Sequence, residues 1–314
     1  AFVRDKNKIF KYPESDASSL RSVIAKKFNI DEERIICGSG SDQIFDLTCQ
    51  LFIEPGDEVI VSEFGFIMHR IYASLYQAKV RLAKENFSKV SVDEILKNVT
   101  NKTKIVFIAN PNNPTGTYIS KNNMLDLREK LRSDILLVVD DAYFEFLNKK
   151  DYVSGLELFK NSENVLITRT FSKIYGLAGL RLGWAYSSKT IINSMYHIKP
   201  PFNVNRAALV AGVEAIQDNE WTQKAIEYNT LWSKKIFSVL QEYKIKTNEP
   251  TTNFFLMNFD ETKINSEKAF QELSKERLIL REMKQYKAPN SLRLTIGDEK
   301  ANEHFLKSIG KILK

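Results

Sequence analysis

The segment TFSKIYGLAGLRLGW, at residues 170–184, decides the fold prediction. An apolar run at 164–168 leads into it and predicts a buried strand. Lys173 lies between bulky, mostly apolar neighbours, and partial loss of hydration favours the neutral amine that attacks carbonyls. The hydroxyls of Thr170 and Ser172 and the guanidinium of Arg181 suit a phosphate, because arginine matches phosphate oxygens in a forked geometry. An isolated Ser-Lys pair is more often a surface lysine beside a turn, so the rest of the chain has to decide.

Length and composition indicate a soluble globular chain with two domains. The sequence has 314 residues, too many for one ordinary core, with 43% hydrophobic and 27% charged residues. It contains no run of about eighteen apolar residues, so we expect no membrane span. Its start has no apolar segment of the kind that signal peptides carry.

The numbers of cysteines and histidines and the distribution of charge argue against several kinds of binding site and partner. The two cysteines, Cys37 and Cys49, provide no disulfide framework, and a reducing cytoplasm is the default for such a chain. They have no further ligand at metal-binding spacing, and with only three histidines (His69, His197 and His304) we expect no metal site. The net charge of +7 comes from dispersed lysines without a basic stripe, so we expect no nucleic-acid partner and a mild attraction for anionic substrates.

Strands and helices alternate between about residues 20 and 200, which predicts a mainly parallel α/β sheet. The predicted strands are 34–37, 58–61, 79–82, 104–108, 135–139 and 164–168. The predicted helices are 18–28, 43–52, 92–99 and 124–131, with another that the aromatic cluster 64–66 opens and that ends at Leu75.

The second half of the chain has a different character. A rigid Pro-Pro break lies at 199–205, and a long helical stretch follows at 206–242 with an interruption near Asp218 and Asn219. Predicted strands at 253–257, 278–281 and 291–297 and helices at 266–275 and 299–313 indicate a smaller α+β domain. We therefore divide the chain into a large domain at 1–202 and a small C-terminal domain at 203–314.

Polar motifs follow several of the predicted strands. The turn Gly38–Asp42 precedes a helix, where backbone N–H groups converge on an anion. The heptapeptide Asn110–Gly116 contains two Asn-Pro pairs, which force extended or turn backbone and leave amide side chains projecting from a strand end. Asp140 and Asp141 follow a strand buried on both faces, where carboxylates are costly unless paired. In a parallel sheet such carboxyl ends meet at the edge where ligands bind.

Together these motifs resemble the fold-type I aminotransferases that use pyridoxal 5'-phosphate, and most closely the histidinol-phosphate aminotransferase family. The resemblance extends from Tyr12-Pro13-Glu14 to the run Arg293–Gly297, so it covers nearly the whole chain. It implies an α/β fold whose large domain holds a mainly parallel seven-stranded sheet between helices, followed by the smaller C-terminal α+β domain.

The resemblance also implies the catalytic roles. Lys173 would bind the cofactor covalently and then move the proton at the substrate Cα. Asp140 would pair with the pyridinium nitrogen and keep the ring an electron sink. Tyr143 and Asn113 would hydrogen-bond the phenolic oxygen of the ring.

The resemblance also implies which residues would contact the face of the cofactor ring and its phosphate. Phe66 would stack on the ring, with Phe64 as the less favoured choice. The residues that would hold the phosphate are Ser41, Asp42, Thr170, Ser172 and Arg181. Tyr12, on an N-terminal arm at 1–15, would reach the cofactor phosphate of the neighbouring subunit. A homodimer with shared active sites follows from that contact.

Two arginines would bind the substrate. Arg293 resembles the arginine that clamps the α-carboxylate in a bidentate pair, and a structural salt bridge is the alternative for it. Arg281 resembles the residue that meets the phosphate of histidinol phosphate, with Lys284 and Lys287 as alternatives nearby. Histidinol phosphate has no α-carboxylate, so glutamate would be the substrate that uses Arg293 fully.

Two features depart from the family's pattern. The family carries a further segment before Tyr12 that lines the substrate site, so we expect either a sequence limited to ordered residues or the loss of this segment. His69 stands where the family often has tyrosine. We expect an ordinary helix-surface histidine there, in preference to one that faces the substrate.

These observations predict a cytoplasmic, dimeric aminotransferase of histidine biosynthesis, in which glutamate donates the amino group. The alternatives on the same fold are an aromatic amino acid aminotransferase and a decarboxylase of phosphoserine or phosphothreonine, which differ in the bond at Cα that is broken. A non-catalytic regulator that binds a cofactor or effector is an alternative of another class. Against it, Lys173, Asp140 and Arg293 are all present.

Overall fold

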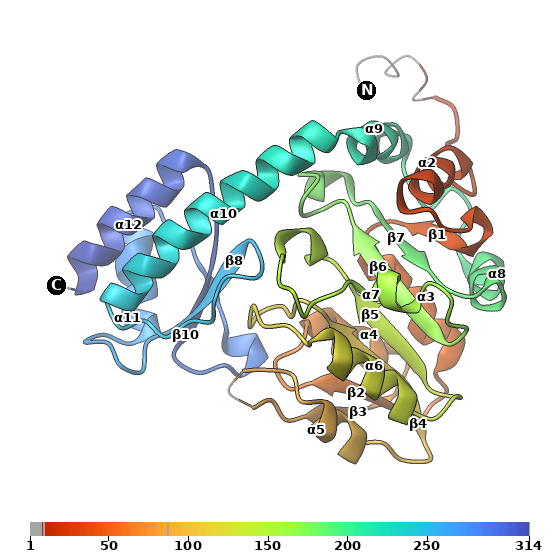
Figure 1. The fold of residues 1–314 in the computed structure, drawn as a ribbon, viewed down its shortest axis with the longest axis horizontal. Helices are drawn as coiled ribbons and strands as arrows, with labels where there is room; N and C mark the ends of the chain where they lie inside the picture. Colours follow the sequence, from red (N-terminus) through yellow and green to blue (C-terminus); the bar gives the residue numbers. More distant parts are fainter. Residues whose placement is uncertain (1–7, 9, 87, 314) are drawn as a thin grey trace.

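A seven-stranded sheet forms the centre of the large domain. The structure is a computed structural model that describes residues 8, 10–86 and 88–313 (Figure 1). The strands are β1 (Ile35–Gly38), β2 (Glu58–Ser62), β3 (Lys79–Ala83), β4 (Thr103–Ala109), β5 (Leu136–Asp140), β6 (Val165–Thr170) and β7 (Gly183–Tyr186). They lie in the order β1-β7-β6-β5-β4-β2-β3. Only β7 runs antiparallel to its neighbours, which confirms the predicted mainly parallel sheet.

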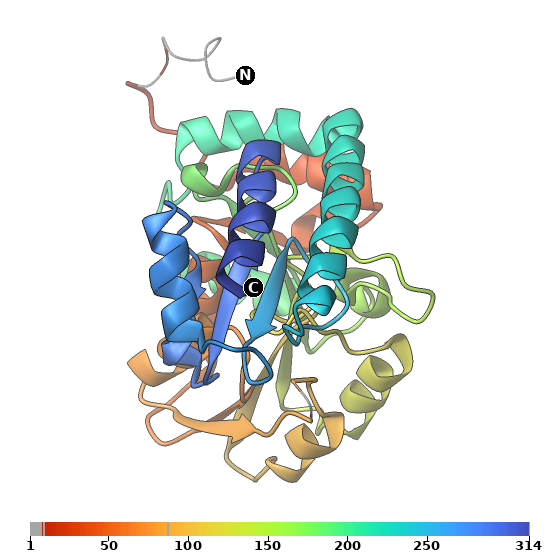
Figure 2. The same cartoon turned by 90° about the vertical axis from the view of Figure 1, so that its left-hand side faces the viewer.

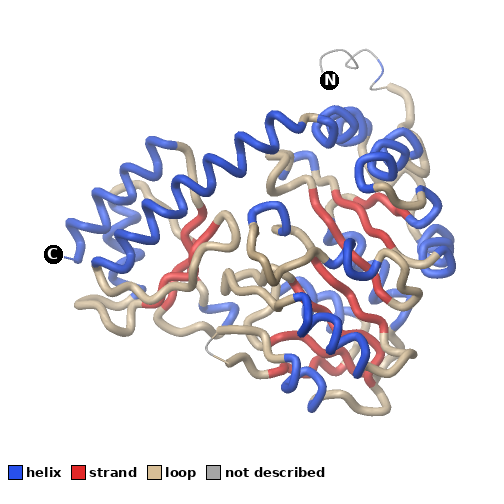
Figure 3. Tube along the Cα trace, in the orientation of Figure 1, coloured by secondary structure: helices blue, strands red, loops and turns tan. Residues whose placement is uncertain are grey.

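Helices cover both faces of this sheet (Figure 3). One face carries α2 (Ser18–Phe28), α5 (Val92–Lys97), α6 (Lys121–Lys130), α7 (Gly155–Phe159) and α9 (Arg206–Gln217). The other carries α3 (Ser41–Phe52), α4 (Ile67–Leu75) and α8 (Lys189–Ile198). Successive residues of β4 alternate between the two cores, with Val106 and Ile108 in one and Ile105 and Phe107 in the other. The strand is therefore buried on both faces, as its continuous apolar run predicts.

A three-stranded antiparallel sheet forms the C-terminal part (Figure 2). It consists of β8 (Phe254–Asn258), β9 (Arg281–Glu282) and β10 (Ser291–Thr295), in the order β8-β10-β9. Its core includes side chains of α10 (Asn219–Glu242), α11 (Ser266–Lys275) and α12 (Glu299–Leu313). The predicted strand at 278–281 is wrong in extent. The N–H of Leu278 closes the end of α11 by donating to the Leu273 carbonyl at 2.9 Å, and pairing with β10 begins only at Arg281.

The predicted interruption of the long helical stretch is confirmed. Asp218 separates α9 from α10, and its carboxylate caps α10 by accepting from the Trp221 N–H at 2.8 Å. Ala225 packs against the core of the large domain, whereas Ile236 belongs to the core of the small one. Helix α10 thus runs between the two parts (Figure 1). The packing suggests that the chain passes between the two cores within α10, and the division after residue 202 stays a prediction.

The carboxyl ends of the parallel strands bring the polar motifs to one edge of the large sheet. β2 ends at Ser62, β4 runs into the asparagine loop 110–116, and β5 ends at Asp140. β6 ends at Thr170, directly before the loop of Lys173. The edge thus collects the motifs that the sequence singled out, which is where open α/β sheets bind ligands. None of the helices within residues 8, 10–86 and 88–313 is long and apolar enough to cross a membrane.

Candidate active site

Two side chains from different elements lie beside the Asp140 carboxylate, and one of them donates a hydrogen bond to it. Asp140 is the last residue of β5 and is 4% exposed. Its Oδ1 accepts a hydrogen bond from Thr168 Oγ1 on the neighbouring strand β6 at 3.1 Å. Its Oδ2 lies 3.8 Å from His69 Nε2 on α4. Among the described residues no lysine or arginine forms an ion pair with Asp140, so its charge is available to a cationic group.

His69 is buried, so the expectation of a helix-surface histidine is wrong. Its side chain is 1% exposed and stacks on Phe107 with the ring centroids 4.8 Å apart. The edges of Phe45 and Phe66 complete the surroundings. His69 and Ala73 are the buried residues of α4 and are spaced by one helical turn, so this spacing is the signal that sequence reasoning missed. Among the residues that the structure describes, none forms a hydrogen bond with the Nε2 atom.

Lys173 and Tyr143 lie together at the sheet edge. Lys173 lies three residues past the end of β6, and its Nζ is 5.2 Å from the centre of the Tyr143 ring. Tyr143 is buried, with its ring packed edge to face on Phe254 of β8 at 5.1 Å. Tyr143 follows Asp140 by three residues, so a carboxylate, a phenol and an amine come from the ends of β5 and β6.

The predicted phosphate residues also converge. Arg181 Nη2 donates to Asp42 Oδ2 at 3.0 Å, and Arg181 Nη1 donates to Ser172 Oγ at 3.4 Å. The Ser172 N–H in turn donates to Thr170 Oγ1 at 3.0 Å. Ser41 and Asp42 are the first residues of α3, whose start has no side-chain cap. Its first N–H groups are therefore available to an anion.

Two glycines allow Arg181 and β7 to lie close to the start of α3. Gly40, with φ +79°, precedes α3, and a Cβ there would lie 2.5 Å from Arg181 Nη2. A Cβ on Gly183 would lie 2.4 Å from the Ser41 backbone nitrogen. Any side chain at either position would push the guanidinium or the strand away from the start of α3. Burial raises the pKa of the Asp42 carboxyl, and the charge of Arg181 opposes that shift.

Arg293 enters the site from the small domain. It lies on β10, and its Nη1 donates to Asn113 Oδ1 at 2.6 Å. Its guanidinium carbon lies 4.9 Å from the Phe254 ring centre, and its Nε is buried without a partner. No carboxylate of the described residues forms an ion pair with Arg293, which disfavours the structural salt bridge considered from the sequence.

Arg281 lies directly opposite Arg293 in the pairing of β9 with β10. Side chains of directly opposed residues share one face of a sheet, so the two guanidinium groups share a face. Arg281 is exposed, and its Nη2 contacts Gln285 Oε1 at 3.5 Å. The alternative Lys284 is paired with Glu282 at 3.0 Å, whereas Lys287 is exposed.

The two candidate ring-stacking aromatics have different surroundings. Phe66 packs beside His69, with the ring centroids 5.5 Å apart. Phe64 instead packs against a small cluster that includes Leu256 and Met283 of the small domain. This difference favours Phe66, which stays the predicted residue for the ring face.

Tyr12 lies away from these contacts within the chain. Its ring is 80% exposed and stacks on Phe202 with centroids 4.6 Å apart. Residues 1–7 and 9 of the predicted N-terminal arm lie outside the described residues. The contact of Tyr12 with a neighbouring subunit therefore stays a prediction.

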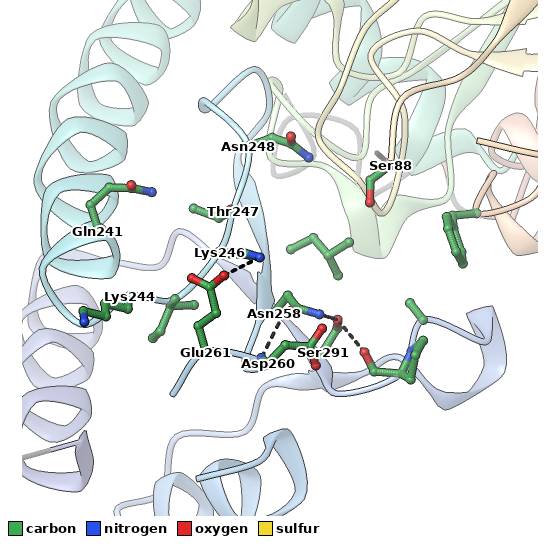
Figure 4. Close-up of a pocket in the computed structure, with 15 residues that line it drawn as sticks. Ser88, Gln241, Lys244, Lys246, Thr247, Asn248, Asn258, Asp260, Glu261 and Ser291 are labelled. Atoms are coloured by element: carbon green, nitrogen blue, oxygen red, sulfur yellow. Dashed lines mark hydrogen bonds and ion pairs between the residues drawn. The ribbon is translucent and has the colours of Figure 1, made fainter. Parts of the chain in front are cut away.

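A separate pocket of about 620 Å³ lies beside β8 and is not the predicted site (Figure 4). Lys246, Asn248, Asn258 and Ser291 are among its lining residues, and Lys246 is paired with Glu261. Of the residues singled out from the sequence, only Phe64 lines it.

The donor set fits pyridoxal 5'-phosphate. A buried carboxylate without a lysine or arginine partner suits a protonated ring nitrogen, and an uncapped helix start beside an arginine suits a phosphate dianion. Lys173, beside the Tyr143 ring, supplies an amine at the same edge of the sheet. The group would thus meet a charge of opposite sign at each end and an amine near its aldehyde.

Comparison with known proteins agrees with this geometry. Residues 2–309 match the family described as "Aminotransferase class I and II". The chain belongs to this family. A histidinol-phosphate aminotransferase of Pelagibacter ubique (strain HTCC1062) is 52% identical over 305 residues, which are 97% of this chain and 85% of the relative. The enzyme of the same name from Maricaulis maris (strain MCS10) is 39% identical over 315 residues, covering 100% and 87%.

The fold is also that of a solved aminotransferase. The crystal structure of histidinol-phosphate aminotransferase from Sinorhizobium meliloti in complex with pyridoxal-5'-phosphate has a TM-score of 0.92 and 20% identity. The match covers 99% of this chain and 85% of that one. Fold-type I architecture is therefore confirmed for this chain.

Proposed function

We propose that this chain is a pyridoxal-phosphate-dependent histidinol-phosphate aminotransferase of histidine biosynthesis. It transfers an amino group between glutamate and imidazole-acetol phosphate, the oxo form of histidinol phosphate. The identity of 52% with the Pelagibacter relative supports this substrate. The observation in the structure that carries it is the pair Arg293 and Arg281, which share one face of the small sheet.

The two arginines match the two kinds of anion in such a pair of substrates. Arg293 is half-buried and has an unpartnered Nε, so it can form a bidentate contact with the α-carboxylate of glutamate. Arg281 is exposed at the neighbouring position, where the phosphate of the second substrate can reach it. One face thus serves a carboxylate and a phosphate in turn, which a ping-pong exchange requires.

Different residues of the chain would take different parts in proton transfer. When bound, pyridoxal 5'-phosphate supplies an electron sink for the carbanion at the substrate Cα. The Asp140 carboxylate would pair with the ring nitrogen of the bound group, while Thr168 donates a hydrogen bond to that carboxylate and His69 packs beside it. The Lys173 amine would hold the cofactor through its aldehyde and would serve as the base for the proton at the substrate Cα. The centre of the Tyr143 ring lies 5.2 Å from that amine.

Ser41, Asp42, Thr170, Ser172 and Arg181 are proposed to hold the phosphate, and Asn113 and Phe66 to contact the ring. Arg293 holds the Asn113 amide through its oxygen, which leaves the Asn113 Nδ2 to donate to the phenolic oxygen. We further propose a cytoplasmic homodimer in which Tyr12 of each subunit completes the partner's phosphate site. The exposed, stacked ring of Tyr12 supports that role.

A survey of half-reactions tests the proposal. The loaded protein is mixed separately with glutamate, histidinol phosphate, phenylalanine and phosphothreonine, and the absorbance of the bound cofactor is followed. Conversion to the amino form with both glutamate and histidinol phosphate is the expected result. Conversion with phenylalanine in place of histidinol phosphate would identify an aromatic aminotransferase, and carbon dioxide release from phosphothreonine would identify a decarboxylase.

A further inference from the structure

Glu85 forms a junction of three segments at the edge of the large sheet. It lies two residues past the end of β3. Its Oε1 accepts hydrogen bonds from Ser62 Oγ at 2.7 Å, from the Phe64 N–H at 3.2 Å and from Asn112 Nδ2 at 3.4 Å. Its own N–H donates to Glu63 Oε2 at 3.2 Å. A single carboxyl oxygen therefore joins the end of β2, the aromatic turn and the asparagine loop.

Two of these segments carry proposed cofactor contacts. The aromatic turn 64–66 ends at Phe66, which is the N-cap residue of α4. Asn112 directly precedes Asn113, whose Oδ1 accepts from Arg293. Asn112 also holds its own loop, because its N–H donates to the Thr117 carbonyl at 2.7 Å and the Gly116 N–H donates back to its carbonyl at 2.9 Å. Movement at the Glu85 junction would therefore displace both the ring face and the Asn113 amide.

The electrostatics of the junction are set by burial. The pKa of the Glu85 carboxyl is raised to about 7, mainly by burial, and the nearby Glu63 carboxylate acts in the same direction. The three donors act in the opposite direction. Ser62 faces it from β2, Glu63 and the Phe64 N–H from the turn, and Asn112 from the loop. Oε2 is buried without a hydrogen-bond partner, so Oε1 alone makes the contacts.

We propose that Glu85 is a positioning residue, which joins the aromatic turn to the asparagine loop and fixes Phe66 and Asn113 relative to each other. The inference rests on the proposed cofactor contacts of those two residues. Glu85 itself touches no reacting atom. The pKa of Glu85 is higher with the three hydrogen bonds formed than in the unfolded chain, so the folded junction is more stable when the carboxyl is protonated. The junction therefore loses stability as the pH rises from the ordinary pKa of glutamate towards 7.

Hydrogen exchange on the apoprotein tests the junction without relying on turnover. Glu85→Leu removes the acceptor, whereas Glu85→Gln keeps an acceptor oxygen and removes the charge. Loss of the three hydrogen bonds to this buried carboxyl is expected to change the opening equilibrium by roughly tenfold to hundredfold. At about pH 6 we expect Glu85→Leu to exchange at least about tenfold faster in both 62–66 and 110–117. Glu85→Gln should remain protected. The matched control is Glu33→Leu. Glu33 is an exposed glutamate that precedes β1, at the opposite edge of the seven-stranded sheet from β3.

The pH dependence provides a second test should Glu85→Leu fail to fold. Protection of both segments in the wild-type protein should fall between about pH 5 and about pH 7, and protection in Glu85→Gln should stay flat. Equal pH dependence in the two proteins, or faster exchange of only one segment in Glu85→Leu, would overturn the junction. A third outcome is possible for Glu85→Leu, in which both segments exchange faster but the dissociation constant for pyridoxal phosphate is unchanged. That result would support the junction and contradict the proposed cofactor contacts of Phe66 and Asn113.

Discussion

The hydroxyl of Thr168 offers a clean test of how the buried carboxylate is held. Thr168→Val keeps the side-chain shape and removes the one donor to Asp140 Oδ1, at 3.1 Å. Thr168 is fully buried, so no water replaces the lost hydrogen bond. A hydrogen bond to a charged group is worth about 1.5–3 kcal/mol, and about 1.4 kcal/mol corresponds to a factor of ten. We therefore expect transamination to fall roughly tenfold to hundredfold, because the carboxylate is less able to keep the ring nitrogen protonated.

The assay is the single-turnover rate with glutamate, measured with saturating cofactor, together with the melting temperature. Thr48→Val is the matched control, because Thr48 is equally buried but donates to the Ile44 carbonyl within α3. The control should have a lower melting temperature but an unchanged single-turnover rate per folded molecule. A Thr168→Val protein that turns over as fast as Thr48→Val would refute the reasoning that Asp140 depends on this hydrogen bond.

Further predictions concern three other positions. Asp140→Asn should lower the single-turnover rate by at least about a hundredfold while cofactor remains bound, and an unchanged rate would remove Asp140 from the ring nitrogen. Arg293→Lys should raise the KM for glutamate about tenfold or more, because lysine cannot form the bidentate contact, with little change in the KM for histidinol phosphate. Burial raises the pKa of Glu85 to about 7, so the folded protein holds an extra proton between about pH 4.5 and 7 and loses stability as the pH rises through that range. Thermal melts should show that Glu85→Gln gains in melting temperature over the wild type as the pH is raised from about 5 to about 8, and parallel pH curves would contradict this.

The periodic elements could be predicted because local pattern and tertiary packing agree. Helices α2, α11 and α12 begin and end where the apolar spacing and the terminal residues predict. By contrast, α8 and β7 had no predicted range. β7 has only four residues and begins at a glycine of the preceding loop, whereas the equally short β1 begins with the apolar run Ile35-Ile36-Cys37. α8 does carry a capping signal, because Ser188 accepts from the Ile191 N–H, but it follows β7 without a distinct turn.

The site was predictable where a role belongs to a motif and unpredictable where it depends on packing between elements. Lys173, Tyr143 and Arg181 lie where their motifs suggested. His69 and Glu85 belong to no motif, and attention falls on them only because of the neighbours that surround them in the folded chain. Only the folded chain brings His69 next to Asp140, seventy-one positions further along the sequence.

The attachment point of the cofactor tests the central claim most directly. The full-length protein is loaded with pyridoxal 5'-phosphate, reduced with borohydride to make the covalent link permanent, digested and analysed by mass spectrometry. The account predicts that the added mass lies on Lys173, and that it disappears when glutamate is added before the reduction. Modification of a different lysine, or no modification at all, would contradict it.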